Sequence, residues 1–269
     1  MAVELQFEKK PKWIMAINDS LVMIKRSSTH IIRNTDQLLG TFFQPIMFLV
    51  LFSAVFGGAI ALALPPGVSY LSFLMAGIIV QTLAFGSTTT AVAITNDLQK
   101  GIVDRFRSLP MATGAVLNGH VVSDLFRNTI STVVMLLAGL VLGFRSSASF
   151  MDWLAIAGLL LLFTFAFSWL MAIMGVVAKS VEGVQWLSFV IIFPLTFASS
   201  AFVPTENMNK YLKAFAENQP ISQVIEAVRA LMLGTPIGNH GFWAVFWCVV
   251  MLVFAIPTAI ILFKRKTTK

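Results

Sequence analysis

The sequence predicts an all-α polytopic membrane protein, and three observations carry that prediction. Apolar residues make up 57% of the 269 residues and charged residues only 12%, with a mean hydropathy of +0.84, whereas a soluble domain has about 25% charged residues. The apolar residues form six continuous stretches, each long enough to cross a membrane as a helix of about 20 residues. A transmembrane β-barrel would instead alternate apolar and polar residues over about ten positions.

The spans and the basic residues together predict the topology. Fourteen of the nineteen Lys and Arg residues lie in the N-terminal segment, the second and fourth connections and the C-terminal tail. Because basic residues concentrate in cytoplasmic loops, we expect a bacterial inner-membrane protein with both termini in the cytoplasm. The six predicted spans are residues 39–64, 70–94, 121–144, 153–178, 184–203 and 243–263, between a cytoplasmic segment 1–38 and a basic tail 264–269, so that residues 39–263 form the transmembrane domain.

Helices are also predicted outside the spans, first in the N-terminal segment and in the outer segment. In the N-terminal segment, apolar residues from Trp13 to Ile24 recur at helical spacing among polar ones, which is typical of an amphipathic helix in the membrane interface or on the protein's own surface. In the outer segment 204–241, Pro220 begins a helix with one apolar face, and Gly234 and Pro236 end it. Proline in the first turn and glycine after the last are the usual helix boundaries.

Motifs for covalent chemistry are absent from the sequence. The chain contains no Gly-Lys dipeptide, so it has no phosphate-binding loop of the G-x-x-x-x-G-K-[ST] kind, and we expect no catalytic residue, metal or cofactor in this chain. Cys248 is the single cysteine, which excludes a disulfide framework within one chain. The net charge of +7 is explained by the basic loops of a membrane protein, so we expect no nucleic-acid partner.

The loop after the second span predicts a short charged helix over residues 97–110. Leu98, Ile102, Phe106 and Leu109 share one helical face, and charges of alternating sign follow at spacings of three and four. Pro110 should end the helix. Such a helix could dock into a groove on a soluble partner or could be a solvated loop, and the residues by themselves leave both interpretations open.

Three separated motifs resemble one family. Residues 95–110 (TNDLQKGIVDRFRSLP) are similar to the coupling segment of type-2 ABC exporter permeases of the daunorubicin and doxorubicin resistance kind. Residues 193–204 (FPLTFASSAFVP) match the end of that family's fifth span, and 218–220 (NQP) with 227–231 (AVRAL) extend the match over nearly the whole chain. Gln219 departs from the pattern, since it interrupts an expected asparagine-proline pair.

The resemblance implies the assembly and its energy source. It implies a homodimer of six-span subunits in membrane lipid, joined to two copies of a soluble ATPase that binds Mg-ATP, and short helices in segment 204–241 that dip back into the outer leaflet. The cargo implied is an amphipathic small molecule or drug, although lipids, peptides and lipid-linked glycans are alternatives. The residues implied in ATPase coupling are Asp97, Lys100, Gly101, Asp104, Arg105, Phe106, Arg107, Leu109 and Pro110.

Polar and aromatic residues inside the spans suggest two further roles. Asp124 and Arg127 are one helical turn apart toward the cytoplasmic end of the third span, so we predict a structural ion pair near the interface rather than a proton relay. An aromatic first span and a polar second span could line a substrate path, or could simply pack against lipid and neighbouring helices. The candidate path residues are Phe42, Phe43, Phe48, Phe52, Gln81, Ser87 and Thr88.

Two other function classes compete with an exporter. A membrane enzyme acting on lipid would need converging acid, base or metal-binding groups, which the sequence does not offer. An ion-coupled secondary transporter should carry carboxylates within its spans and often internal repeats. Asp124 is the single candidate carboxylate for that role.

Overall fold

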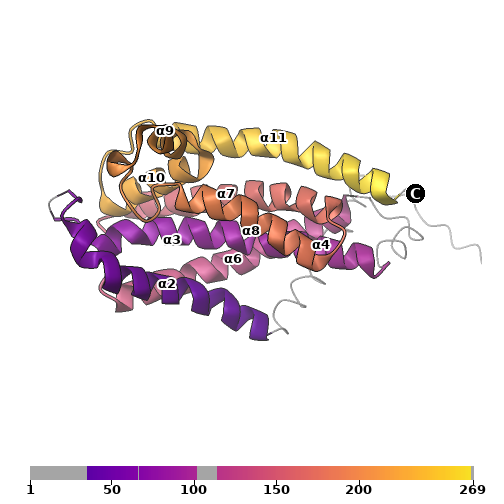
Figure 1. Cartoon of the computed structure of the whole chain (residues 1–269), viewed down its shortest axis with the longest axis horizontal. Coiled ribbons are helices and arrows are strands. Elements are labelled where there is room, and N and C mark those ends of the chain that lie inside the picture. The colour runs from indigo at the N-terminus through magenta and orange to yellow at the C-terminus, as the bar shows by residue number, and fades with distance from the viewer. Residues whose placement is uncertain (1–34, 66, 102–113, 268–269) are drawn as a thin grey trace, which may run out of the picture.

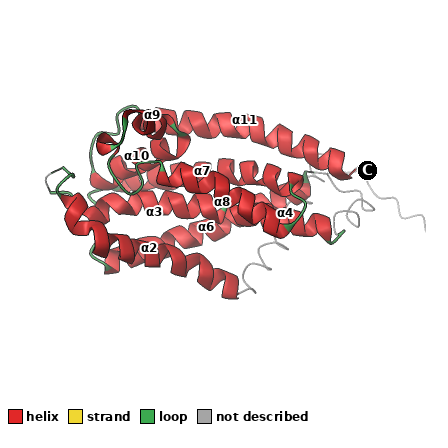
Figure 2. Cartoon of the chain, viewed as in Figure 1, coloured by secondary structure: helices red, strands yellow, loops and turns green. Residues whose placement is uncertain are grey.

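The computed structural model describes residues 35–65, 67–101 and 114–267, and this part of the chain consists of helices and connecting loops without a strand (Figure 2). The predicted all-α membrane fold is therefore confirmed. The predicted N-terminal amphipathic helix and residues 102–110 of the predicted coupling helix lie outside the described residues.

Long helices lie side by side along the long axis of the molecule (Figure 1). Five helical segments of the described chain are long and apolar enough to cross a membrane. Helix α7 is central, since it packs against α11, α4 and α6, while α2 packs against α3 and α6. The helices that make up these segments are α2 (Thr35–Ala61), α3 (Tyr70–Gly86) followed by α4 (Thr88–Gln99), α6 (Ala115–Val141), α7 (Phe150–Val177) and α11 (His240–Thr267).

The fifth predicted span, residues 184–203, is a shorter helix than expected. Helix α8 (Val181–Phe197) has 17 residues, a length of about 26 Å at 1.5 Å per residue, which is less than the roughly 30 Å of a hydrocarbon core. It begins beside α4 and ends beside α10 (Pro220–Leu233). Within residues 35–65, 67–101 and 114–267, five long segments and one short apolar helix therefore correspond to the six predicted spans.

The second predicted span is broken near its middle and is longer than predicted. Helix α3 ends at Gly86, α4 starts at Thr88, and the Ser87 hydroxyl donates to the carbonyl of Leu83 at 2.9 Å. Helix α4 then continues to Gln99, five residues beyond the predicted end at residue 94. Asp97, expected to begin an exposed coupling helix, instead lies in the last turns of α4 and is buried.

Segment 204–241 forms a cap over one end of the bundle, which we call the α10 end (Figure 1). It contains a 3-10 turn (Thr205–Asn207), α9 (Lys210–Asn218) and α10. Helix α10 has the predicted boundaries, with Pro220 in its first turn and Gly234 in the left-handed region at φ 67°. Its apolar face packs against α3, α7 and α11. The other end of the bundle, where α4 and α11 end, is the α4 end.

Candidate functional site

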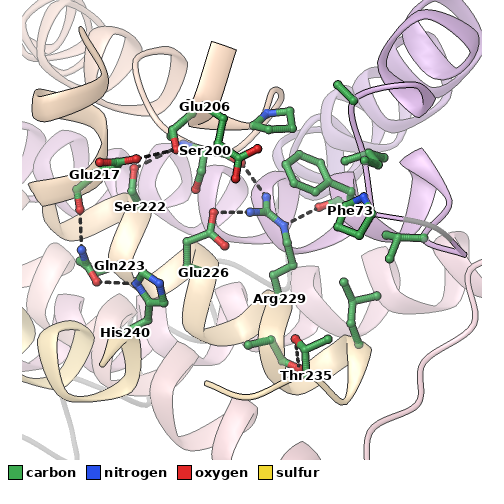
Figure 3. A pocket seen from close by; sticks show the side chains of 18 of the residues that line it. Phe73, Ser200, Glu206, Glu217, Ser222, Gln223, Glu226, Arg229, Thr235 and His240 are labelled. Atoms are coloured by element: carbon green, nitrogen blue, oxygen red, sulfur yellow. Dashed lines mark hydrogen bonds and ion pairs between the residues drawn. The ribbon is translucent and has the colours of Figure 1, made fainter. Parts of the chain in front are cut away.

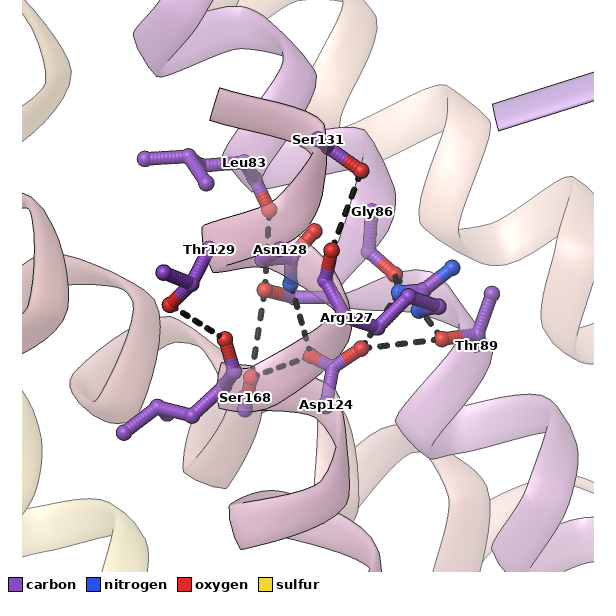
Figure 4. A network of polar contacts seen from close by, with 11 residues as sticks. Leu83, Gly86, Thr89, Asp124, Arg127, Asn128, Thr129, Ser131 and Ser168 are labelled. Atoms are coloured by element: carbon purple, nitrogen blue, oxygen red, sulfur yellow. Dashed lines mark hydrogen bonds and ion pairs between the residues drawn. The ribbon is translucent and has the colours of Figure 1, made fainter. Parts of the chain in front are cut away.

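A buried polar network surrounds Asp124 where α3, α4, α6 and α7 meet (Figure 4). One carboxylate oxygen, Oδ2, accepts hydrogen bonds from Ser168 Oγ at 2.6 Å and from Asn128 Nδ2 at 3.1 Å. The other oxygen forms an ion pair with Arg127 and lies 3.0 Å from Thr89 Oγ1. We call these residues the Asp124 network. It ties α4 and α7 to the α6 carboxylate.

Arg127 connects this network to the break in the second span. Its guanidinium donates to the carbonyl oxygen of Gly86, the last residue of α3. A break in a helix leaves backbone groups without their usual partners, so a side-chain donor at this carbonyl stabilises the break. Asp124 and Arg127 are only 2% and 3% exposed, so the predicted pair is buried within the bundle.

A continuous series of aromatic rings follows α8 and crosses to α2. The ring centroids of Phe193 and Phe197 are 4.2 Å apart, those of Phe197 and Phe202 are 4.8 Å apart, and Phe202 stacks on Phe52 at 4.7 Å. The α8 rings are exposed on this chain, whereas Phe202 is buried. We call this series the aromatic row, and its members are Trp186, Phe189, Phe193, Phe197, Phe202, Phe52, Phe48 and Phe56.

The aromatic row contains only two of the predicted path residues, Phe48 and Phe52. Sequence reasoning missed the α8 rings, although their spacing of three, four and four residues from Trp186 to Phe197 places them on one helical face. The other predicted path residues are dispersed: Phe43 is 70% exposed, Phe42 and Thr88 are partly buried, Gln81 is buried, and Ser87 lies 3.2 Å from Ser168 beside the Asp124 network.

Three of the predicted coupling residues are described. Asp97 Oδ2 lies 3.0 Å from His120 Nε2, so this carboxylate contacts α6 within the chain. Lys100 is exposed, and Gly101 has φ 63°, a left-handed conformation that favours glycine where α4 ends. The remaining six, Asp104, Arg105, Phe106, Arg107, Leu109 and Pro110, lie outside the described residues.

At the α10 end, Arg229 of α10 holds three segments together (Figure 3). Its Nε donates to Phe73 O at 3.1 Å, one terminal nitrogen donates to Ser200 O at 2.6 Å, and the other pairs with Glu226 Oε1 at 2.5 Å. The guanidinium carbon also lies 3.6 Å from the centroid of the Phe73 ring. Burial lowers the pKa of Arg229, and Glu226 opposes that shift. Sequence analysis included Arg229 only within the motif 227–231 (AVRAL).

Comparison with known proteins decides the family, because the model of the ABC-2 type transporter family matches residues 19–233. The chain belongs to the ABC-2 type transporter family. It is 32% identical over 263 residues to the daunorubicin resistance ABC transporter permease protein DrrB1 of Streptomyces coeruleorubidus, covering 96% of this chain and 90% of the relative. It is also 25% identical over 249 residues to the "Probable doxorubicin resistance ABC transporter permease protein DrrC" of Mycobacterium tuberculosis, covering 91% and 88%.

ABC-2 membership confirms the resemblance carried by residues 95–110, 193–204 and 218–231. The chain is a multi-pass transmembrane permease subunit of an ABC transporter, and the family implies that the ATPase is a separate subunit. Within the described residues, no group of three His, Cys, Asp or Glu side chains could hold a metal ion.

Proposed function

We propose that this permease exports amphipathic aromatic small molecules from the cytoplasm or the inner leaflet, driven by the partner ATPase. The observation that carries the proposal is the aromatic row, because it offers a ligand a series of stacking positions along the bundle. The family supports the proposal, since two relatives are named for resistance to daunorubicin and doxorubicin.

The geometry of the row suits planar, partly apolar cargo. Neighbouring centroids along α8 are 4.2 to 6.3 Å apart, within the range of favourable aromatic contacts, which contribute about 0.5–1.5 kcal/mol each. Because successive positions are similar in kind, a planar ligand can pass from one to the next without a deep energy minimum. A series of weak binding positions of this kind favours movement of the ligand along the row over its retention at one position.

The assembly we propose follows the family resemblance. Two copies of this chain would join along the exposed faces of α8 and α2, and two ATPase copies would bind Mg-ATP. Both termini and the α4 end would lie in the cytoplasm, with the α10 end outside. Within the segment 97–110, the exposed Lys100 and the residues that follow Gly101 would contact the ATPase, and Asp97, which is held against His120, would pass the movement to α6.

The substrate class is tested by ATP-dependent uptake of doxorubicin into inverted membrane vesicles that contain the permease and its ATPase. We expect Phe193→Ala to lower the uptake rate at least threefold, because it removes a ring from the middle of the row. Phe254→Ala, an exposed ring on α11 that is not in the row, is the matched control and should leave uptake unchanged. Equal rates for wild type and Phe193→Ala would contradict the proposed path.

Coupling is tested by co-purification of a tagged permease from native membranes in mild detergent. We expect an ATPase in roughly equal copy number, and loss of its binding or of substrate-stimulated ATP hydrolysis in Asp104→Ala/Arg107→Ala. The control is Lys179→Ala/Glu182→Ala, two exposed residues at the other α4-end connection. Uptake that needs no nucleotide-hydrolysing partner would favour a secondary transporter instead.

A further inference from the structure

The cap at the α10 end contains a half-open cavity that the permease function does not by itself explain (Figure 3). Its volume is about 560 Å³, within the range of small-molecule sites. The walls come from the loop before α3, the loop after α8, α10 and the first residue of α11, with Leu64, Val68 and Leu233 among the apolar lining residues. We call it the Arg229 cavity.

Carboxylates outnumber cationic groups in the lining of the Arg229 cavity. Glu206, Glu217 and Glu226 supply three negative charges against one positive charge from Arg229, a net of −2 with His240 neutral. All three nitrogens of Arg229 already donate within the chain, to Phe73, Ser200 and Glu226. Its charge is therefore engaged with the protein, and the cavity favours a cationic ligand over an anionic one.

Two polar atoms at the cavity lack partners among the described residues. Ser200 is 1% exposed and its Oγ has no hydrogen-bond partner there, although buried hydroxyls are nearly always paired. Gln223 Nε2 donates a hydrogen bond to the carbonyl of Glu217, and the other amide atom, Gln223 Oε1, lies 2.9 Å from His240 Nδ1. Because an amide oxygen can only accept, His240 Nδ1 is the donor in this contact. The Nε2 of His240 is then an acceptor, and it too could receive a hydrogen bond from a ligand.

The aromatic row passes close to this cavity at Phe202. Phe202, the last ring before the row crosses to α2, follows the cavity-lining residue Ser200 by two positions. Phe202 is fixed there because its carbonyl accepts a hydrogen bond from the Tyr70 hydroxyl at 3.0 Å. Cargo that reached Phe202 would therefore lie near the cavity that holds the carboxylates.

We propose that the Arg229 cavity binds the protonated amine of an amphipathic organic cation before its release, with Glu206 and Glu217 as the principal counter-charges and Ser200 Oγ as a hydrogen-bonding group. The inference rests on the proposed function and narrows its cargo to cationic amphipaths. Glu226 contributes less to binding a cation, because one of its carboxylate oxygens is already paired with Arg229. Glu217 Oε1 accepts a hydrogen bond from Thr205 Oγ1 at 3.1 Å and lies 3.6 Å from Lys213 in an exposed pair, which compensates its charge only weakly.

The test is equilibrium binding of doxorubicin and of N-acetyldoxorubicin to the permease–ATPase complex in lipid nanodiscs without nucleotide. The two ligands share one ring system, but acetylation removes the amine charge. For Glu206→Gln/Glu217→Gln we expect the Kd of doxorubicin to rise at least fivefold and the Kd of N-acetyldoxorubicin to stay within twofold. Both glutamates are partly or fully exposed, so the fold should persist.

The control is Glu182→Gln, an exposed glutamate at the α4 end, which should change neither Kd. An unchanged Kd for doxorubicin in the double variant, or an equal loss of affinity for both ligands, would overturn the proposal. The measurement is independent of transport, because no ATP is present. A failure of ATP-driven uptake in vesicles would contradict the proposed function and leave the charge preference of the cavity measurable.

Discussion

At the scale of single residues, the Asp124 network shows how a charged pair is tolerated inside the bundle. A buried ion pair is stable only if further hydrogen bonds satisfy the remaining donors and acceptors. Here both oxygens of Asp124 have at least two polar neighbours each, and Arg127 also donates to the α3 carbonyl of Gly86. Arg127 Nε and Asn128 Oδ1 are buried without a hydrogen-bond partner among the described residues, so the network satisfies the carboxylate more fully than the guanidinium. We therefore propose that the pair is structural, as its spacing predicts, because neither oxygen is left for an exchangeable proton.

The first prediction removes one member of this pair. Asp124→Ala should destabilise the permease by about 3–5 kcal/mol, because it leaves the Arg127 charge uncompensated in the bundle. Thermal unfolding can be followed by a thiol-reactive fluorogenic dye, since the single cysteine, Cys248, is buried in the folded chain. Asp124→Ala/Arg127→Ala should unfold at a higher temperature than Asp124→Ala. A double variant that is the less stable of the two would contradict the structural role.

The second prediction concerns Gln219, the residue that departs from the family pattern. Its Nε2 donates to the carbonyls of Leu195 and Ala198 at 2.7 and 2.8 Å, so it caps the C-terminus of α8. Gln219→Ala should cost about 1–3 kcal/mol, because buried carbonyls lose their donor. Gln219→Glu should cost more, since a carboxylate would face the same oxygens. The dye assay measures both, and exposed Asn218→Ala should be near neutral; similar unfolding temperatures for all three variants would exclude the cap.

At the scale of elements, hydropathy predicted where helices lie better than where they end. The fourth span was predicted at 153–178 and is Phe150–Val177 in the structure. The agreement is close because the ends of the apolar run are also the ends of the helix. The break after Gly86 depends on Arg127 from α6, and the end of α8 depends on Gln219, which lies more than 20 residues later in the sequence. Counting apolar residues along a short stretch of sequence cannot detect either of these contacts. The aromatic rings on α8 could have been predicted from their spacing in the sequence. The Arg229 cavity could be found only from the folded structure.

A third prediction tests the close packing of α4 on α7. A Cβ atom at Gly175 would lie 2.5 Å from the carbonyl oxygen of Ala91 and 2.8 Å from its Cα, both backbone atoms that cannot rotate away. Gly175→Ala should therefore separate the two helices at a cost of about 1–3 kcal/mol. The control lies in the same helix: Gly158 has open space around its Cβ position, and Gly158→Ala should stabilise by about 0.5–1 kcal/mol. Equal unfolding temperatures for Gly175→Ala and Gly158→Ala would show that α4 and α7 are not packed this closely.

At the scale of the whole molecule, the number of crossings depends on α8. The helix is shorter than a typical hydrocarbon core, yet it begins beside α4 and ends beside α10, at opposite ends of the bundle (Figure 1). The neighbouring loop 198–203 extends its reach, since Ala201 lies directly against Gly77 of α3. A short helix with an extended loop can cross if the membrane thins locally at modest cost. We therefore propose six crossings with α8 as the fifth.

The fourth prediction tests this topology by cysteine labelling. Because Cys248 is buried, introduced cysteines should dominate the reaction with a membrane-impermeant thiol reagent. In right-side-out vesicles, Lys213→Cys in α9 should react at once, whereas Lys179→Cys before α8 and Arg265→Cys near the C-terminus should react only after permeabilisation. Labelling of positions 179 and 213 from the same side would mean that α8 does not cross and that the chain has five crossings. Reaction at 179 and 265 but not at 213 would reverse the orientation and place the Arg229 cavity in the cytoplasm, where a cation would be captured rather than released.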